Sequence, residues 1–143
     1  MTRTDTTTPA SDGSPTRPRV LLVDDNAAML DRAAMILAGT CTIVGTAREG
    51  RSAIAAAAEL TPDVIVLDIS MPGMNGFEVA AALRHAGSTA AVVFLTVHQE
   101  DDFFSVARGA GGLGYVIKPR LVTDLVEAVL SVNDGRPYAS PKS

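Results

Sequence analysis

The chain has 143 residues, of which 47% are hydrophobic and 20% are charged, and its formal net charge at pH 7 is −4. This length predicts one domain with a sizeable core. Nucleic-acid binding would call for a clustered basic face, and the acidic net charge gives no indication of one, so we expect the chain itself to bind no nucleic acid. One cysteine excludes an internal disulfide, and no apolar run is long enough for a membrane span or a signal core. We therefore expect a cytoplasmic protein without membrane contact.

The two ends of the chain differ from its middle. Residues 1–18 are rich in Thr, Ser, Pro and Gly and have almost no apolar surface to bury, which predicts a disordered tail. We place the domain at residues 19–134 and a C-terminal tail at residues 135–143.

Between the tails, short apolar runs alternate with segments of helical period. The runs are residues 20–23, 42–44, 64–67, 92–95 and 115–117, and the helical segments are residues 30–37, 51–60, 79–86, 103–110 and 122–129. Four runs are apolar on both faces, as buried parallel strands are, and the more polar second run suits an edge strand. The pattern predicts an α/β fold, a doubly wound sheet of five parallel strands with five helices.

In the last helical segment, the core stripe is expected to comprise Val122, Leu125, Val126 and Val129.

Polar side chains follow four of the five expected strands. Asp24 and Asp25 follow the first, Asp68 the third, Thr96 the fourth and Lys118 the fifth. Ligands of an open parallel sheet bind beyond the carboxyl ends of its strands. We therefore expect three carboxylates, a hydroxyl and an ammonium group to converge on one rim of the sheet.

This set of groups suits phosphoryl transfer. Carboxylates held together repel one another and favour a hard cation, for which Mg²⁺ is the usual choice. The metal and Lys118 would spread the charge of a phosphoryl group, to which Thr96 could donate a hydrogen bond. Asp68 stands alone at the central strand and is the candidate nucleophile, forming an acyl phosphate. Asp24 and Asp25 form the metal-side pair.

Four motifs stand in order at these strand ends. They are Val23-Asp24-Asp25-Asn26, Leu67–Gly76, Leu95-Thr96 and Tyr115–Pro119. Together they resemble the response regulator receiver family, over about Arg19 to Asn133. The resemblance implies a CheY-like (flavodoxin-like) fold with strand order 2-1-3-4-5. It also implies a two-component phosphorelay, in which a sensor histidine kinase or phosphotransfer protein phosphorylates Asp68, and a signalling domain in place of an enzyme.

The resemblance assigns further roles at the rim. Asp25, Asp68 and the backbone carbonyl of Ser70 would bind Mg²⁺, with Asp24 acting partly through water. Thr96 and Tyr115 would form a switch, in which Thr96 moves toward the phosphoryl group and Tyr115 swings inward behind it.

The family's partner contacts imply an interaction face on the fourth helix, fifth strand and fifth helix. Phe104 and Arg108, on the side of the fourth helix opposite its core stripe, are candidate interface residues toward an unknown downstream protein. The alternative is that Phe104 is an incidental surface residue, as outward Phe side chains more often are. A second copy of the chain is a further candidate partner. The peptide bond between Lys118 and Pro119 is often cis in this family, whereas only about 5–6% of X-Pro bonds are cis in general.

Other interpretations compete with this one. The pair Asp24-Asp25 could be a helix N-cap. Residues 109–114 match a glycine-rich dinucleotide pattern but precede a strand, where that motif does not function. A phosphohydrolase would place a second carboxylate two residues after the nucleophile, where this chain has Ser70. A degenerate receiver would be a protein-binding scaffold only and would fail to bind Mg²⁺.

The output is the less defined part of this interpretation. The C-terminal half resembles receivers of the NarL/LuxR branch, in which a DNA-binding domain usually follows. Because the chain ends at Ser143, we expect a stand-alone receiver, and the alternative is a truncated transcriptional regulator. The sequence identifies neither the kinase, the downstream target, the lifetime of the phosphoryl group nor the oligomeric state.

Overall fold

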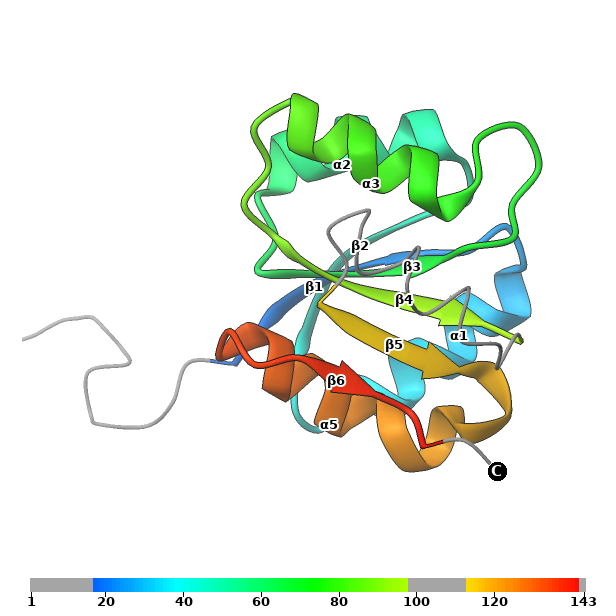
Figure 1. Cartoon of the computed structure of the whole chain (residues 1–143), viewed down its shortest axis with the longest axis vertical. Coiled ribbons are helices and arrows are strands. Elements are labelled where there is room, and N and C mark those ends of the chain that lie inside the picture. Colours follow the sequence, from blue (N-terminus) through cyan, green and yellow to red (C-terminus); the bar gives the residue numbers. More distant parts are fainter. Residues whose placement is uncertain (1–16, 98–112, 142–143) are drawn as a thin grey trace, which may run out of the picture.

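A parallel sheet with helices on both faces forms the fold, and the computed structural model describes residues 17–97 and 113–141 of it (Figure 1). The strands are β1 (Arg19–Val23), β2 (Thr42–Ala47), β3 (Val64–Asp68), β4 (Ala91–Thr96), β5 (Gly114–Ile117) and β6 (Tyr138–Ala139). The helices are α1 (Ala27–Leu37), α2 (Gly50–Leu60), α3 (Gly76–His85), the 3₁₀ turn η3 (Lys118–Arg120) and α5 (Leu121–Asn133).

The strand order is β2-β1-β3-β4-β5-β6, and all neighbouring strands are parallel. The five predicted strands, their order and the edge position of the second strand are thereby confirmed. The short β6, within the expected C-terminal tail, is an addition that the sequence pattern does not predict. Within the described residues there are four α-helices; the helix expected at residues 103–110, and the tail expected over residues 1–16, lie outside them.

Two apolar layers hold the helices to the sheet, and Figure 1 shows α2 and α3 on one face and α1 and α5 on the other. Alternate strand residues supply the two layers, because successive side chains of a strand point to opposite faces. Leu21 and Ile65 pack toward α2 and α3, whereas Leu22 and Val66 pack toward α1 and α5. All four side chains are buried. The site therefore rests on strands that are fixed from both sides.

The core stripe of α5 differs from the predicted one. Val122, expected in the stripe, is 65% exposed. The buried positions are Leu121, Asp124, Leu125, Ala128, Val129 and Val132. The stripe is thus rotated by about one residue, and it includes a carboxylate.

The loop after β3 is fixed at the start of α3. Asn75 is the N-cap of α3, and it exchanges hydrogen bonds with Glu78 in a capping box. Gly76, the first residue of α3, lies against the backbone of Asp68, since a Cβ atom there would lie 2.5 Å from the Asp68 carbonyl oxygen. The helix start is therefore packed directly against the end of β3.

The peptide bond between Lys118 and Pro119 is trans, since the described residues contain no cis peptide bond. The cis form that is frequent in the family is therefore not the one found here. Pro119 lies in the turn η3, directly before α5, and the trans form is also the intrinsically favoured one by about 0.5–1 kcal/mol.

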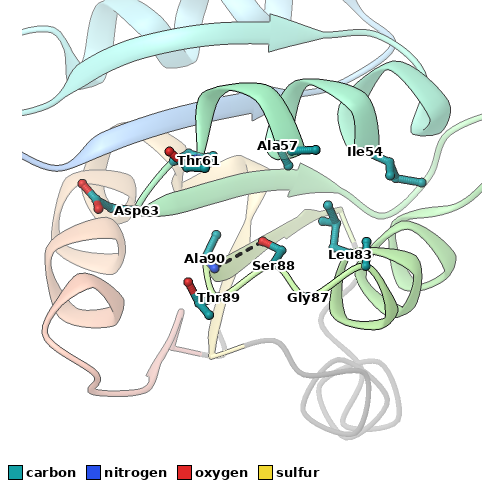
Figure 2. A pocket seen from close by; sticks show the side chains of 12 residues that line it. Ile54, Ala57, Thr61, Asp63, Leu83, Gly87, Ser88, Thr89 and Ala90 are labelled. Atoms are coloured by element: carbon teal, nitrogen blue, oxygen red, sulfur yellow. Dashed lines mark hydrogen bonds between the residues drawn. The ribbon is translucent and has the colours of Figure 1, made fainter.

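A cavity of about 350 Å³ opens at the edge of the sheet where β3 and β4 begin (Figure 2). Ile54, Leu83 and Ala90 contribute to its wall, and its single charged lining residue is Asp63. The Asp63 carboxylate already accepts a hydrogen bond from the Arg19 backbone at 2.9 Å. The cavity therefore lacks the group of reactive side chains that is found at the other ends of the strands.

None of the described helices combines the length and apolar character needed to cross a membrane.

Candidate functional site

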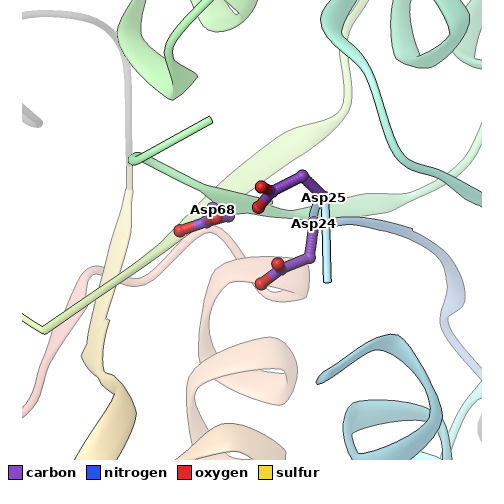
Figure 3. A group of neighbouring side chains, drawn as sticks. All are labelled: Asp24, Asp25 and Asp68. Carbon is purple, nitrogen blue, oxygen red and sulfur yellow. The ribbon is translucent and has the colours of Figure 1, made fainter. Parts of the chain in front are cut away.

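Three carboxylates meet at the carboxyl ends of β1 and β3 (Figure 3). Asp24, Asp25 and Asp68 each offer an oxygen that lies within 4.8 Å of the oxygens of the other two. Asp24 and Asp68 are buried and Asp25 is half-buried. The neighbouring strands β1 and β3 pair in register up to Val23 and Leu67, so the residues that follow them are brought together by the sheet itself.

Lys118 connects two of these carboxylates. Its Nζ lies 3.1 Å from Oδ1 of Asp68 and 3.3 Å from Oδ2 of Asp24. Burial lowers the pKa of Lys118, but the carboxylates of Asp68 and Asp24 more than offset this, so its pKa is raised. Lys118 therefore keeps its positive charge in the site at neutral pH.

Asp68 has a strongly altered acidity. Its burial and then the charge of Asp24 raise its pKa to about 6, against the opposing effects of Lys118 and of the Ser70 backbone N–H. That N–H donates a hydrogen bond to Oδ1 of Asp68 at 3.2 Å. Asp68 is consequently ionised at pH 7, but its charge is less stabilised than that of an aspartate in water.

One buried oxygen in the site has few partners among the described residues. Oδ1 of Asp24 accepts the Asn26 backbone N–H at 2.9 Å, whereas for the buried Oδ2 the part of the chain that the structure describes offers the ammonium group of Lys118 at 3.3 Å and no further donor. A buried carboxylate oxygen in this state is poorly solvated. Together with the triad of oxygens it fits a hard cation with oxygen ligands. The acidic triad could therefore hold a metal ion.

The helix-cap interpretation of the acidic pair does not hold. The N-cap of α1 is Asn26, whose side chain accepts the Met29 backbone N–H at 3.1 Å. Neither Asp24 nor Asp25 therefore serves as the N-cap of α1.

Arg48 contacts the backbone of Asp25, an interaction that was not predicted from the sequence. Its Nη2 and Nε donate hydrogen bonds to the backbone carbonyl of Asp25 at 2.9 and 3.2 Å. The side chain lies in the loop after β2 and is exposed. No sequence pattern links it to a residue 23 positions earlier. It fixes the backbone of the one triad member that is only half-buried.

The structure places the two predicted switch residues in the core. Thr96 ends β4 and is 1% exposed, next to the end of β5 in the pair Thr96–Ile117. Tyr115 on β5 is buried in the layer that faces α2 and α3. Ser70 is exposed beside Asp68. The movements of Thr96 and Tyr115, and metal binding by the Ser70 carbonyl, stay predictions.

The interface candidates Phe104 and Arg108 lie outside the described residues, so their role also stays a prediction. The sequence did not predict a hydrogen-bonded group formed by Asp124, Arg120 and Ser140 beside the turn η3, which begins at Lys118. The available signal was a charged residue, Asp124, between Leu121 and Leu125 in the stripe of α5.

The fold and the acidic pocket define a CheY-like α/β domain with a pocket typical of phosphoacceptor sites. Residues 20–130 match the family described as the response regulator receiver domain, so the chain belongs to that family. Members of this family are phosphoacceptor signalling modules of two-component systems, as the sequence analysis predicts, and they interact with kinases and regulatory proteins.

Named relatives agree with this assignment. Response regulator GacA of Pseudomonas viridiflava is 35% identical over 126 residues, which cover 87% of this chain and 59% of that protein. The probable transcriptional regulatory protein NarL of Mycobacterium tuberculosis is 33% identical, and the match covers 92% of this chain and 62% of that protein. The chain thus spans about three-fifths of the length of these relatives.

Solved structures resemble this one closely. A LuxR-family two-component response regulator from Aurantimonas sp. SI85-9A1 superposes with a TM-score of 0.84 at 30% identity, covering 88% of this chain and 91% of that chain. The receiver domain of the putative response regulator NarL from Mycobacterium tuberculosis gives 0.80 at 33% identity, covering 85% of this chain and 100% of that chain. The matched part of this chain is the receiver domain.

Proposed function

We propose that this chain accepts a phosphoryl group on Asp68 from the phosphohistidine of a sensor histidine kinase or phosphotransfer protein. The observation that carries the proposal is the position of Asp68, which is buried between two further carboxylates and an ammonium group 3.1 Å away. This combination of a nucleophilic oxygen, a candidate metal site and a fixed cation is what an aspartyl phosphate requires.

In the proposed reaction, an oxygen of Asp68 forms a P–O bond while the P–N bond to the donor imidazole breaks. The imidazole nitrogen keeps the electron pair of the broken bond. Asp68 is ready to act at neutral pH because its raised pKa, about 6, still lies below 7. In this proposal Lys118 shares the charge of the phosphoryl oxygens, and Thr96 donates a hydrogen bond to one of them.

We propose Mg²⁺ as the ion of the acidic triad, held by Asp25 and Asp68, by Asp24 in part through water, and by the carbonyl of Ser70. The poorly solvated Oδ2 of Asp24 supports a cation at this position. Bound Mg²⁺ would offset the charge of the carboxylates and of the phosphoryl oxygens. All ligands in this set are oxygens, which Mg²⁺ prefers.

The test is phosphorylation by acetyl phosphate, followed by intact-protein mass spectrometry with and without Mg²⁺. We expect one phosphoryl group on the wild-type chain, with Mg²⁺ required, and none on Asp68→Asn. Asp63→Asn is the matched control, because Asp63 precedes the same strand β3 at its other end and is exposed. Labelling that persists in Asp68→Asn, or that Asp63→Asn removes, would contradict the assignment.

A second proposal concerns output. The relatives named above include a probable transcriptional regulatory protein, and this chain covers 62% of its length. Regulation of transcription is therefore a candidate output of the protein to which this receiver belongs. Sequencing the gene beyond the codon of Ser143 tests it, since a helix-turn-helix coding segment would support this output and a stop codon would support a stand-alone receiver.

A further inference from the structure

A buried carboxylate that the proposed reaction does not use lies directly beside the Lys118 turn. Asp124 of α5 is 2% exposed. A buried carboxylate is costly unless it is paired and hydrogen-bonded. Here Nε and Nη2 of Arg120 donate to its two oxygens at 2.8 and 3.2 Å, and Oγ of Ser140 donates to Oδ2 at 2.7 Å. All of these contacts come from residues near one end of β5.

Ser140 joins this carboxylate to β5. Its Oγ accepts the Ile117 backbone N–H at 3.2 Å, and its own N–H donates to the Tyr115 carbonyl at 2.8 Å. The preceding residues form β6, in which Tyr138 and Ala139 pair with Gly114 and Tyr115. The C-terminal segment is therefore attached along the last residues of β5.

Lys118 lies between the two attachment points. Ile117, the residue before it, is connected to Asp124 through Ser140, and Arg120, two residues after it, is paired with Asp124 directly. One buried carboxylate thus holds both sides of the turn that carries the lysine. The distances from Lys118 to Asp68 and Asp24 depend on that turn, and a displacement of about 1 Å is enough to impair a positioned group.

We propose that Asp124 and Ser140 are positioning residues for Lys118, and that attachment of the C-terminal strand β6 is coupled to phosphoryl acceptance at Asp68. This inference depends on the proposed function. The coupling is reciprocal, because a free-energy link between two sites acts equally in both directions. Loss of the Ser140 contacts slows phosphorylation, and a phosphoryl group held by Lys118 stabilises the attachment of β6.

The variant Ser140→Ala tests positioning, since it removes the hydroxyl that joins Ile117 to Asp124. The variant loses both hydrogen bonds of the Ser140 hydroxyl. Phosphorylation by acetyl phosphate at saturating Mg²⁺ should slow about fivefold, which corresponds to about 1 kcal/mol, the scale of a net hydrogen-bond contribution. Saturating Mg²⁺ keeps the metal site filled in the wild type and the variant, so a difference in rate reports the position of Lys118 and not the occupancy of the metal site. Ser140→Thr keeps the hydroxyl and should restore the rate.

Ser88→Ala is the matched control. Ser88 is also half-buried, and its Oγ also accepts a backbone N–H, that of Ala90 at 3.3 Å. It lies before β4, at the end of the strands opposite to the acidic site (Figure 2). We expect this variant to be phosphorylated at the wild-type rate. An equal loss of rate in Ser88→Ala and Ser140→Ala would reduce the role of Ser140 to general stability and overturn the inference.

Amide hydrogen exchange tests the reverse direction of the coupling. In the beryllofluoride adduct, a stable phosphoryl mimic, the Ser140 amide should exchange about fivefold more slowly than in the unmodified chain. The Ala91 amide donates to the Asp63 carbonyl at the opposite end of the strands, and its exchange rate should be unchanged. Identical Ser140 exchange in both states, or an unchanged rate in Ser140→Ala, overturns the inference alone. Absence of any labelling of the wild type overturns the proposed function as well.

Discussion

Nζ of Lys118 lies 3.1 Å from Oδ1 of Asp68 and shares its charge with Asp24 at 3.3 Å. One ammonium group therefore faces three carboxylates, those of Asp24, Asp25 and Asp68. The negative charge of this site is only partly neutralised by the protein itself. An imbalance of this kind is the physical basis both for cation binding and for the raised pKa of Asp68.

Replacing Asp68 by Asn should stabilise the metal-free protein at neutral pH. The folded pKa of Asp68, about 6, lies above the ordinary value of 3.8. Between these values the folded state binds more protons than the unfolded state, so stability falls as pH rises through this window. The amide introduced in Asp68→Asn does not ionise, so the stability of this variant does not fall in that window. Its gain over the wild type should be on the order of 1–3 kcal/mol above pH 6.5 and small near pH 4.

Urea unfolding in the presence of EDTA at several pH values measures this difference. The stability gap between wild type and Asp68→Asn should open between pH 4 and pH 6 and then stay constant. Addition of Mg²⁺ should narrow the gap, because the cation stabilises the ionised carboxylate only in the wild type. A stability gap that is the same at pH 4 and pH 7 would show that the surroundings of Asp68 do not destabilise its ionised form.

Lys118 should act oppositely on metal binding and on phosphorylation. In Lys118→Met the aliphatic stem is kept but the cation is lost. Phosphorylation should slow about 10²-fold, as when a positioned electrostatic donor is removed. Mg²⁺ should bind about tenfold more tightly, because a positive charge that repels it has been removed. Isothermal titration calorimetry and acetyl phosphate kinetics measure the two effects, and Lys118→Arg keeps the charge as a control. Weaker Mg²⁺ binding by Lys118→Met would contradict this account.

Gly76 should be the residue at which an added methyl group disturbs Asp68 through its backbone. A Cβ at Gly76 would lie 2.5 Å from the Asp68 carbonyl oxygen and 2.7 Å from the Cα of Ile69. Backbone atoms cannot yield as a flexible side chain does, so Gly76→Ala should cost about 1–3 kcal/mol of stability and slow phosphorylation. Gly39→Ala is the control, since nothing lies within 4 Å of its Cβ position. Thermal unfolding that ranks the two variants equally would refute the predicted contact.

The sequence was sufficient for the features that depend on local pattern. Apolar runs predict the strands because a strand buried on both faces needs apolar residues throughout. The site follows from the rule that parallel strands present their carboxyl ends at one edge, which brings Asp24, Asp68, Thr96 and Lys118 to one rim. These residues require no knowledge of side-chain contacts to be selected.

The missed features depend on tertiary contacts. The strand β6 is two residues long and carries no periodicity. It forms because the backbone N–H groups of Tyr138 and Ser140 donate to the carbonyls of Leu113, just before β5, and Tyr115, within it. Helix α5 is apolar on more than one side, so its pattern fits two stripes about one residue apart, and burial selects the stripe with Leu121 in place of Val122. Arg48 contacts a carbonyl group, which every residue has, so its partner leaves no trace in the sequence.

Arg48 should control the metal site through the backbone of Asp25. Its two hydrogen bonds to the Asp25 carbonyl hold the half-buried member of the triad. Arg48→Ala should weaken Mg²⁺ binding about tenfold, the scale typical of groups that orient metal ligands. Loss of a positive charge acts in the opposite direction and should strengthen binding. We expect orientation to dominate because the side chain is exposed, where water and salt screen its charge.

Arg51→Ala separates the two effects. Arg51 is also exposed and lies three residues further along, in α2, so its removal takes away one positive charge and leaves the two hydrogen bonds to the Asp25 carbonyl in place. Arg51→Ala should leave the Mg²⁺ dissociation constant unchanged or slightly lower, whereas Arg48→Ala raises it. Arg48→Lys keeps the charge but offers a single donor group, so it should bind Mg²⁺ with intermediate affinity. If both alanine variants bound Mg²⁺ more tightly than the wild type, charge would be the dominant effect and Arg48 would not orient Asp25.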